Sequence, residues 1–209
     1  GRRFESASRY QKIDYMKKLL LILILSSSLQ SSTAADDISD FEIEGISVGE
    51  SALEYFSVKE IKSAHKNEYK DDAFYDIEIY NHKLLENYKN LQLSFKKNDK
   101  NYIIYSIVGF NFYKKNIQEC LNKVDEVSKE ISNIIKNTRK ISNYKSHAAD
   151  PSGKSKNKQI IFIHETGSIT LECYDWSDEI TKKDGWVDNF GVSISLKEYD
   201  TWITYKAYK

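Results

Sequence analysis

Acid–base chemistry in this 209-residue chain would have to draw on side chains between positions 147 and 175. Two histidines and two aspartates lie there: His147, Asp150, His164 and Asp175. A histidine next to a carboxylate can act as a general base for a distant serine, but any polar loop offers such pairs. We therefore assign no catalytic residue, and we keep a hydrolase-type site near 147–175 as an alternative hypothesis.

A phosphate-binding loop is indicated by only part of its motif. Residues 151–155 read Pro-Ser-Gly-Lys-Ser, but a P-loop needs a further glycine where Ala148 stands, a strand before it and a helix after it. An ordinary flexible loop fits this segment better. The four histidines, which are His65, His82, His147 and His164, lie far apart and lack metal-binding spacing. The sequence therefore predicts no metal site and no cofactor.

The most distinctive surface motif is Tyr174-Asp175-Trp176-Ser177, which we combine with Trp186. Tryptophan and tyrosine dominate the hot spots of protein interfaces, so Tyr174, Asp175, Trp176 and Trp186 form a candidate interaction patch. Asp and Ser also favour turns at strand ends. The alternative is a strand terminator in which Trp176 covers the edge of the core.

Residues Met16–Ala35 have the pattern of a cleavable signal peptide. Two lysines precede an apolar run of about seven residues, well short of the ~20 that span a bilayer. Small residues allow cleavage after Ala34 or after Ala35, and an uncleaved anchor is the alternative. No cysteine follows the apolar run, so we expect membrane contact only through the signal peptide and a periplasmic or secreted product. We take residues 1–15 as an upstream extension outside the fold.

The division of the chain into a signal peptide and a following domain determines how we interpret its charge and its two cysteines. Beyond the signal peptide, residues 36–209 carry roughly 25 Lys and Arg against roughly 29 Asp and Glu, which argues against a nucleic-acid partner. In an oxidising compartment Cys120 and Cys173 become disulfide candidates, because the periodicity directs both into one helix–sheet layer. Two free, buried cysteines are the alternative.

Hydrophobic periodicity predicts a single α+β domain over residues 36–209, in the order β-αα-βββ-α-βββ-α. We expect helices packed on one face of an antiparallel sheet, with two αβββ lobes, 36–113 and 114–209, as an open alternative. The expected strands are 40–44, 73–79, 91–95, 102–112, 158–165, 168–175 and 190–194, and the polar segments 142–158 and 178–188 are expected to be loops.

Capping boxes, in which a side chain at the first helical boundary and a Glu three residues later satisfy free backbone N–H groups, locate the helices. They are Ser47 with Glu50, Ser57 with Glu60, Asn116 with Glu119, and Ser195 with Glu198. They predict helices over 51–56, 58–66 and 116–137, and a terminal helix that buries Tyr199 and Trp202. The helix over 116–137 has the clearest signal, since its apolar residues recur at three- and four-residue steps.

Three segments resemble an uncharacterised family of small exported proteins from marine bacteria. They are Phe-Glu-Ile-Glu-Gly-Ile-Ser-Val-Gly-Glu-Ser at 41–51, Asp-Pro-Ser-Gly-Lys-Ser at 150–155 and Cys-Tyr-Asp-Trp-Ser at 173–177. The resemblance covers most of the chain after the signal peptide and implies export, with no assigned activity, ligand or site. Two helices that lead into a three-stranded meander are also similar to BamE-like outer-membrane assembly lipoproteins and to β-lactamase-inhibitor-like domains, which are binding modules.

These observations favour a non-enzymatic exported domain that binds a protein or an envelope component through its sheet face or its aromatic loop edges. A periplasmic enzyme and a small-molecule binder with a cleft between helix and sheet are the alternatives.

Overall fold

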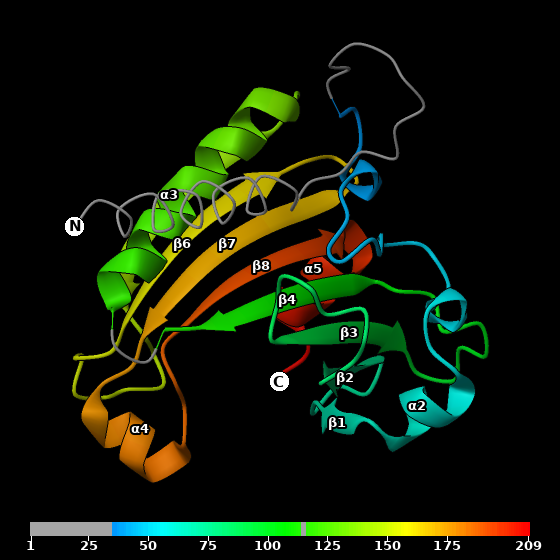
Figure 1. The fold of residues 1–209 in the computed structure, drawn as a ribbon, viewed down its shortest axis with the longest axis horizontal. Coiled ribbons are helices and arrows are strands. Elements are labelled where there is room, and N and C mark those ends of the chain that lie inside the picture. Colours follow the sequence, from blue (N-terminus) through cyan, green and yellow to red (C-terminus); the bar gives the residue numbers. More distant parts are fainter. Residues whose placement is uncertain (1–34, 114–115) are drawn as a thin grey trace, which may run out of the picture.

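An eight-stranded antiparallel sheet runs through both halves of the chain in the computed structural model, which describes residues 35–113 and 116–209 (Figure 1). Its strand order is β1-β2-β3-β4-β8-β7-β6-β5. The strands are β1 (His65–Glu68), β2 (Phe74–Tyr80), β3 (Asn90–Lys96), β4 (Ser106–Phe112), β5 (Arg139–Ser146), β6 (Lys156–Ile163), β7 (Gly167–Asp175) and β8 (Asn189–Leu196). The α+β prediction is therefore confirmed.

Two four-stranded meanders make up this sheet, and they meet where β4 pairs with β8. Each meander follows a helix in the chain, α2 (Val58–Ser63) in the first half and α3 (Ile117–Ile134) in the second. The pairing of β4 with β8 includes a buried contact between Ser106 Oγ and Ser195 Oγ at 2.7 Å. The two halves therefore contribute to one continuous sheet.

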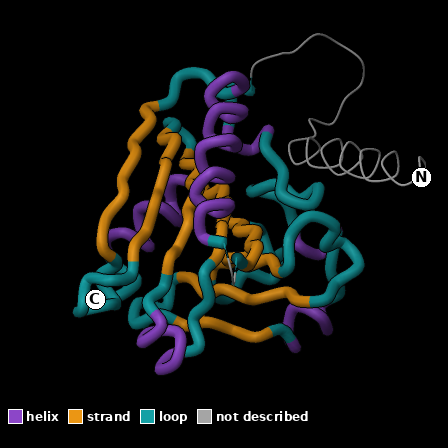
Figure 2. The backbone as a smooth tube through the Cα atoms, turned by 60° about the vertical axis from the view of Figure 1, so that its left-hand side comes forward, coloured by secondary structure: helices purple, strands orange, loops and turns teal. Residues whose placement is uncertain are grey.

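The long helix α3 packs across β6, β7 and β8 on one face of the sheet (Figure 2). The side chain of Asn116 accepts a hydrogen bond from the backbone N–H of Glu119, which confirms the predicted N-cap. Its buried stripe is Cys120, Val124, Val127, Ser128 and Ile131. On the same face of the sheet the cross-strand partners Ile77, Leu93, Ile107, Ile194 and Ile169 complete the main core.

The terminal helix α5 (Lys197–Tyr205) lies on the opposite face of the sheet, behind it in Figure 1. Tyr199 of α5 donates a hydrogen bond to Asp76, and Asp76 points away from its buried neighbour Ile77 because side chains alternate along a strand. Phe74, Tyr199, Trp202 and Ala207 form a second, smaller core there. The prediction that the helices share one face is therefore wrong, although Tyr199 and Trp202 are buried as expected.

Asp76 is a fully buried carboxylate under α5. It accepts hydrogen bonds from Tyr69, Gln92 and Tyr199. Burial raises the pKa of Asp76, while the hydrogen bond from Tyr69 opposes that rise. These contacts give the buried carboxylate the partners it needs.

Several predicted loops are regular elements. The segment 142–158 contains most of β5 and the start of β6, and β1 was not predicted at all. Both missed strands lie at the sheet edges. Each is polar and lacks an alternating apolar pattern, and it is held by backbone pairing with a single neighbouring strand. The segment 178–188 contains the short helix α4 (Asp178–Asp184).

Some predicted elements are shorter than expected. Residues 40–44 form only an isolated bridge between Ile43 and Ile46, and the helix expected over 51–56 is a single 3-10 turn, η3 (Ala52–Glu54), capped by Ser51. The Ser57–Glu60 capping box is present and begins α2. The prediction of a Ser195–Glu198 capping box is wrong, because Ser195 lies inside β8. The helix α5 begins after Leu196, whose side chain makes no capping hydrogen bond.

The proposed signal peptide, apart from Ala35, lies outside the residues that the structure describes. Ala35 is buried, and its backbone N–H donates to the carbonyl of Ile134 at the end of α3 at 3.1 Å. Across 35–113 and 116–209, no helix is long and apolar enough to cross a membrane.

Candidate functional site

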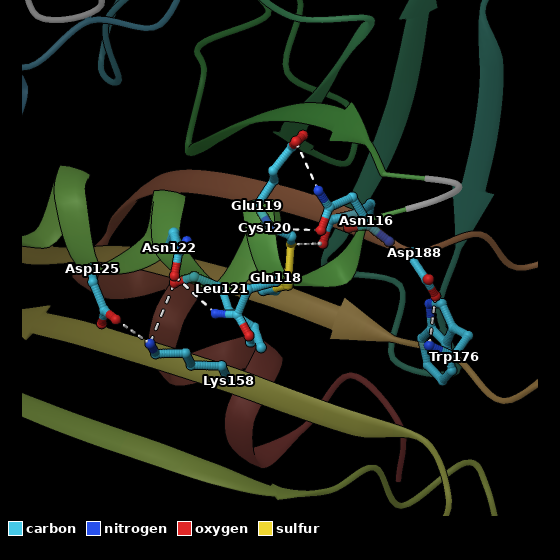
Figure 3. Close-up of a disulfide and its surroundings, with 12 residues drawn as sticks. Asn116, Gln118, Glu119, Cys120, Leu121, Asn122, Asp125, Lys158, Trp176 and Asp188 are labelled. Carbon is cyan, nitrogen blue, oxygen red and sulfur yellow. Dashed lines mark hydrogen bonds and ion pairs between the residues drawn. A yellow bond between two sulfur atoms is a disulfide. The ribbon is translucent and has the colours of Figure 1, made fainter.

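Cys120 and Cys173 form a disulfide that joins α3 to β7 (Figure 3). Their Cα atoms are 5.9 Å apart, both residues are fully buried, and 53 positions separate them in the chain. Nearby, Lys158 Nζ lies 2.6 Å from Asp125 Oδ2 and links β6 to the same helix. The disulfide prediction is confirmed, and a bridge of this kind is typical of an oxidising compartment.

Four aromatic rings gather where β7 ends, and we call them the aromatic cluster: His147, Tyr174, Trp176 and Trp186. The rings of Tyr174 and Trp176 are stacked with a centroid distance of 5.4 Å, and Trp186 lies 4.6 Å from Trp176. His147 packs edge-on against Trp176, also at 4.6 Å. Trp186 is 41% exposed, so the cluster presents an aromatic surface to solvent.

The helix α4 explains how Trp186 reaches Trp176. Ser177 caps the start of α4 by accepting from the N–H of Ile180, and Gly185 ends the helix in the left-handed conformation with φ 74°. Glycine adopts that conformation without a Cβ clash. The chain therefore turns back toward the strand end, where Asp188 accepts a hydrogen bond from the N–H of Trp176 at 2.7 Å. This contact fixes the backbone that carries Trp176.

The structure brings three of the four predicted patch residues together and leaves out Asp175. Asp175 is the cross-strand partner of Lys156 and lies on the α3 face of the sheet, whereas Tyr174 points to the opposite face. Burial, and then the neighbouring charge of Asp188, raises the pKa of Asp175. His147 takes the place of Asp175 in the cluster, because the β5–β6 hairpin returns the chain to the end of β7.

The Asp150 carboxylate organises the loop between β5 and β6. Its Oδ1 accepts from the N–H and hydroxyl of Ser152, and its Oδ2 accepts from the N–H and hydroxyl of Ser155 and from the hydroxyl of Ser177. These bonds, first those from the Ser152 and Ser155 hydroxyls, hold the pKa of Asp150 well below its usual range. The donors that a phosphate would need thus already bind the protein's own carboxylate.

His164 lies far from the other candidate catalytic residues. It follows β6 at the end opposite to Lys156, and eight residues of strand separate the two positions by about 26 Å. His164 is buried, with Nδ1 2.8 Å from the Thr166 hydroxyl. The four residues considered for a hydrolase therefore do not converge, and no group of three or more His, Cys, Asp or Glu in the described ranges could hold a metal.

Polar side chains continue from the aromatic cluster onto the face of the sheet that α3 leaves open. Tyr174 donates a hydrogen bond to Glu172 at 2.9 Å, and burial and then the charge of Glu172 raise the pKa of Tyr174. The cross-strand partners of Tyr174 are Asn157 and Asn189, whose buried side-chain oxygens accept no hydrogen bond from the residues that the structure describes. Buried amide oxygens normally accept one, so these two are exceptions on this face of the sheet.

The space between α3 and the sheet is small. An apolar cavity of about 20 Å³ lies there, bordered by Phe41, Tyr88, Val127, Ile131 and Val192 among others. A cavity of that size holds about one water molecule, whereas sites for small organic ligands enclose roughly 300–1,000 Å³. This cavity therefore does not favour the small-molecule alternative.

No protein-family model, curated protein or solved structure matches this chain. The resemblance to an exported marine-bacterial family therefore stays a prediction.

Proposed function

We propose that this protein is an exported, non-enzymatic module that binds a protein or another envelope component through the aromatic cluster. The observation that carries this proposal is the exposed Trp186 ring, which packs on Trp176 at the end of a disulfide-anchored strand. Rigid aromatic side chains supply large contact areas with little loss of conformational entropy on binding. The proposal is therefore an interface with Trp186 at its centre.

Export is the second part of the proposal. It rests on the signal-peptide pattern of residues 16–35 and on the Cys120–Cys173 disulfide, which suits a periplasmic or secreted protein. The hydrolase alternative has less support, because Asp150 is occupied by serine donors and His164 lies at the far end of β6.

A photo-crosslinking experiment tests the interface. A photoreactive amino acid with an aromatic side chain, which keeps a ring at the centre of the interface, replaces Trp186 in one variant of the full chain and Leu53 in the control. Both native residues are 41% exposed, and Leu53 lies on η3 in the first half of the chain. In an envelope extract we expect one discrete adduct from position 186 and none from position 53. Adding Trp176→Ala should remove that adduct. The same products from both positions, or no discrete adduct from position 186, would contradict the proposed interface.

A further inference from the structure

The outermost strand β5 presents unpaired backbone groups to solvent. The N–H of His147 donates to the carbonyl of Ser155 at 2.9 Å, directly beyond the last paired residues of β5 and β6. Hydrogen-bonded pairs recur at every second residue of an antiparallel ladder, so the odd-numbered residues of β5 bond to β6. The N–H and C=O groups of Lys140, Ser142, Tyr144 and Ser146 consequently point away from the sheet.

No strand among residues 35–113 and 116–209 pairs with that outer side, because β5 ends the strand order. All eight residues of β5 pair with β6, which gives a regular edge of about 27 Å. An exposed edge of this length is a template for another extended chain.

The edge is strongly basic. Residues 136–158 contain seven Lys and Arg and one acidic residue, Asp150, whose carboxylate already accepts hydrogen bonds from serine donors of the chain itself. Lys158 is paired with Asp125, and Lys140 donates to the hydroxyl of Ser128. Arg139 and Lys145 are exposed and form no ion pair within the described ranges.

Arg139 and Lys145 also share one face of the edge. Strand alternation places residues 139, 141, 143 and 145 on the same side, with Ile141 between the two cations. On the other side Tyr144 is 60% exposed and offers an aromatic anchor beside the free backbone groups. The two cations, the unpaired backbone groups and the exposed aromatic side chain therefore lie along one strand.

We propose that β5 binds an extended acidic segment of a partner protein, which adds to the sheet as a ninth strand. The segment would carry two acidic residues six positions apart, one opposite Arg139 and one opposite Lys145. This spacing is the same for parallel and antiparallel addition. Opposite charges directly across two strands attract, and the backbone ladder supplies the rest of the contact.

The charge distribution disfavours two other occupants. A second copy of β5 would bring another Arg139, Lys140 and Lys145 to the edge with no acidic residue on either strand. Residues 1–34 contain six Lys and Arg against two acidic residues, so that part of the chain repels the edge as well. The basic charge of the edge therefore favours an acidic segment of a partner protein.

A labelled-peptide titration of the full chain tests the proposal. The peptide has ten β-prone residues with Glu at positions 2 and 8, and its matched control has Lys at both positions. We expect the Glu peptide to bind about tenfold more tightly or better, and the preference to reverse in the Arg139→Glu/Lys145→Glu variant. Both replaced residues are exposed, so the variant should fold.

Peptide N-methylation separates strand addition from simple charge attraction. Methyl groups on the two central amides that would bond to β5 should abolish binding, and methyl groups on the two intervening amides should leave it nearly unchanged. Equal affinity for the Glu and Lys peptides, no effect of either methylation, or a dimer linked through β5 would overturn the proposal. Trp186→Ala should leave peptide affinity unchanged, so this inference and the proposed aromatic interface can fail independently.

Discussion

We expect the disulfide between Cys120 and Cys173 to make a large contribution to the stability of the fold. It closes a loop whose ends lie 53 positions apart. In the loop-entropy model a loop of that length lowers the entropy of the unfolded chain by about 14 cal/mol/K, or about 4 kcal/mol at 25 °C. Since both sulfurs are fully buried, replacing them by alanine also leaves a small void. We therefore expect Cys120→Ala/Cys173→Ala to lose about 4 kcal/mol of unfolding free energy.

Urea unfolding followed by circular dichroism measures this difference. With a slope of about 2 kcal/mol per molar urea, the midpoint of the variant should fall by about 2 M. Reducing the native protein should give nearly the same decrease, whereas reductant should not move the midpoint of the double-alanine variant. A decrease below about 0.5 M on reduction would refute the reasoning, because it would mean that the cross-link hardly restricts the unfolded chain.

Three further predictions concern single positions. Gly167→Ala places a Cβ 2.0 Å from a backbone oxygen and should lower the free energy of unfolding by about 3 kcal/mol. At Gly185 a Cβ meets free space, so Gly185→Ala adds only the strain of its positive φ and should lower the free energy of unfolding by about 1 kcal/mol. Equal urea midpoints for the two variants would contradict this. Burial raises the pKa of Asp200 from 3.8 to about 6, so the native state binds more protons between about pH 4 and 6 and stability falls as the pH rises through that window. Asp200→Asn should therefore stabilise the protein by up to about 3 kcal/mol at pH 7 and have no stabilising effect below pH 4, and an equal effect at both pH values would contradict the assignment. If residues 16–35 act as a cleaved signal peptide, N-terminal sequencing of the product should give Ala35, because cleavage after that residue would remove a buried contact with the end of α3, and a start at Asp36 would contradict it.

The sequence was most informative where one element carried its own complete pattern. The α3 helix has an N-cap at Asn116 and an apolar stripe along its length, so its start and the burial of Cys120 followed directly, whereas its end at Ile134 comes three residues before the predicted one. The β5 strand has no such pattern, because its outer side meets solvent and only pairing with β6 makes it a strand. A polar edge strand of this kind cannot be deduced from local periodicity, even though its partner is the next strand in the chain.

The candidate site shows the same contrast between features with a local sequence signal and features that depend on the fold. Strand alternation along β7 already separates Tyr174 from Asp175, so the grouping of both in one patch could have been avoided. The α4 helix also had local signals, a cap at Ser177 and a glycine at position 185. The place of His147 in the aromatic cluster had none, since it depends on how the β5–β6 hairpin returns to β7.

The meeting of β4 with β8 has a consequence for how the protein folds. Every other neighbouring pair in the sheet is consecutive in the chain, whereas Ser106 and Ser195 are 89 residues apart. Closing a long loop costs entropy before its contacts form, and such non-local pairings slow folding. We expect the two meanders to gain structure first and to join last. Until then β4 and β8 are open edges, and the hydroxyls of Ser106 and Ser195 keep one end of each edge polar.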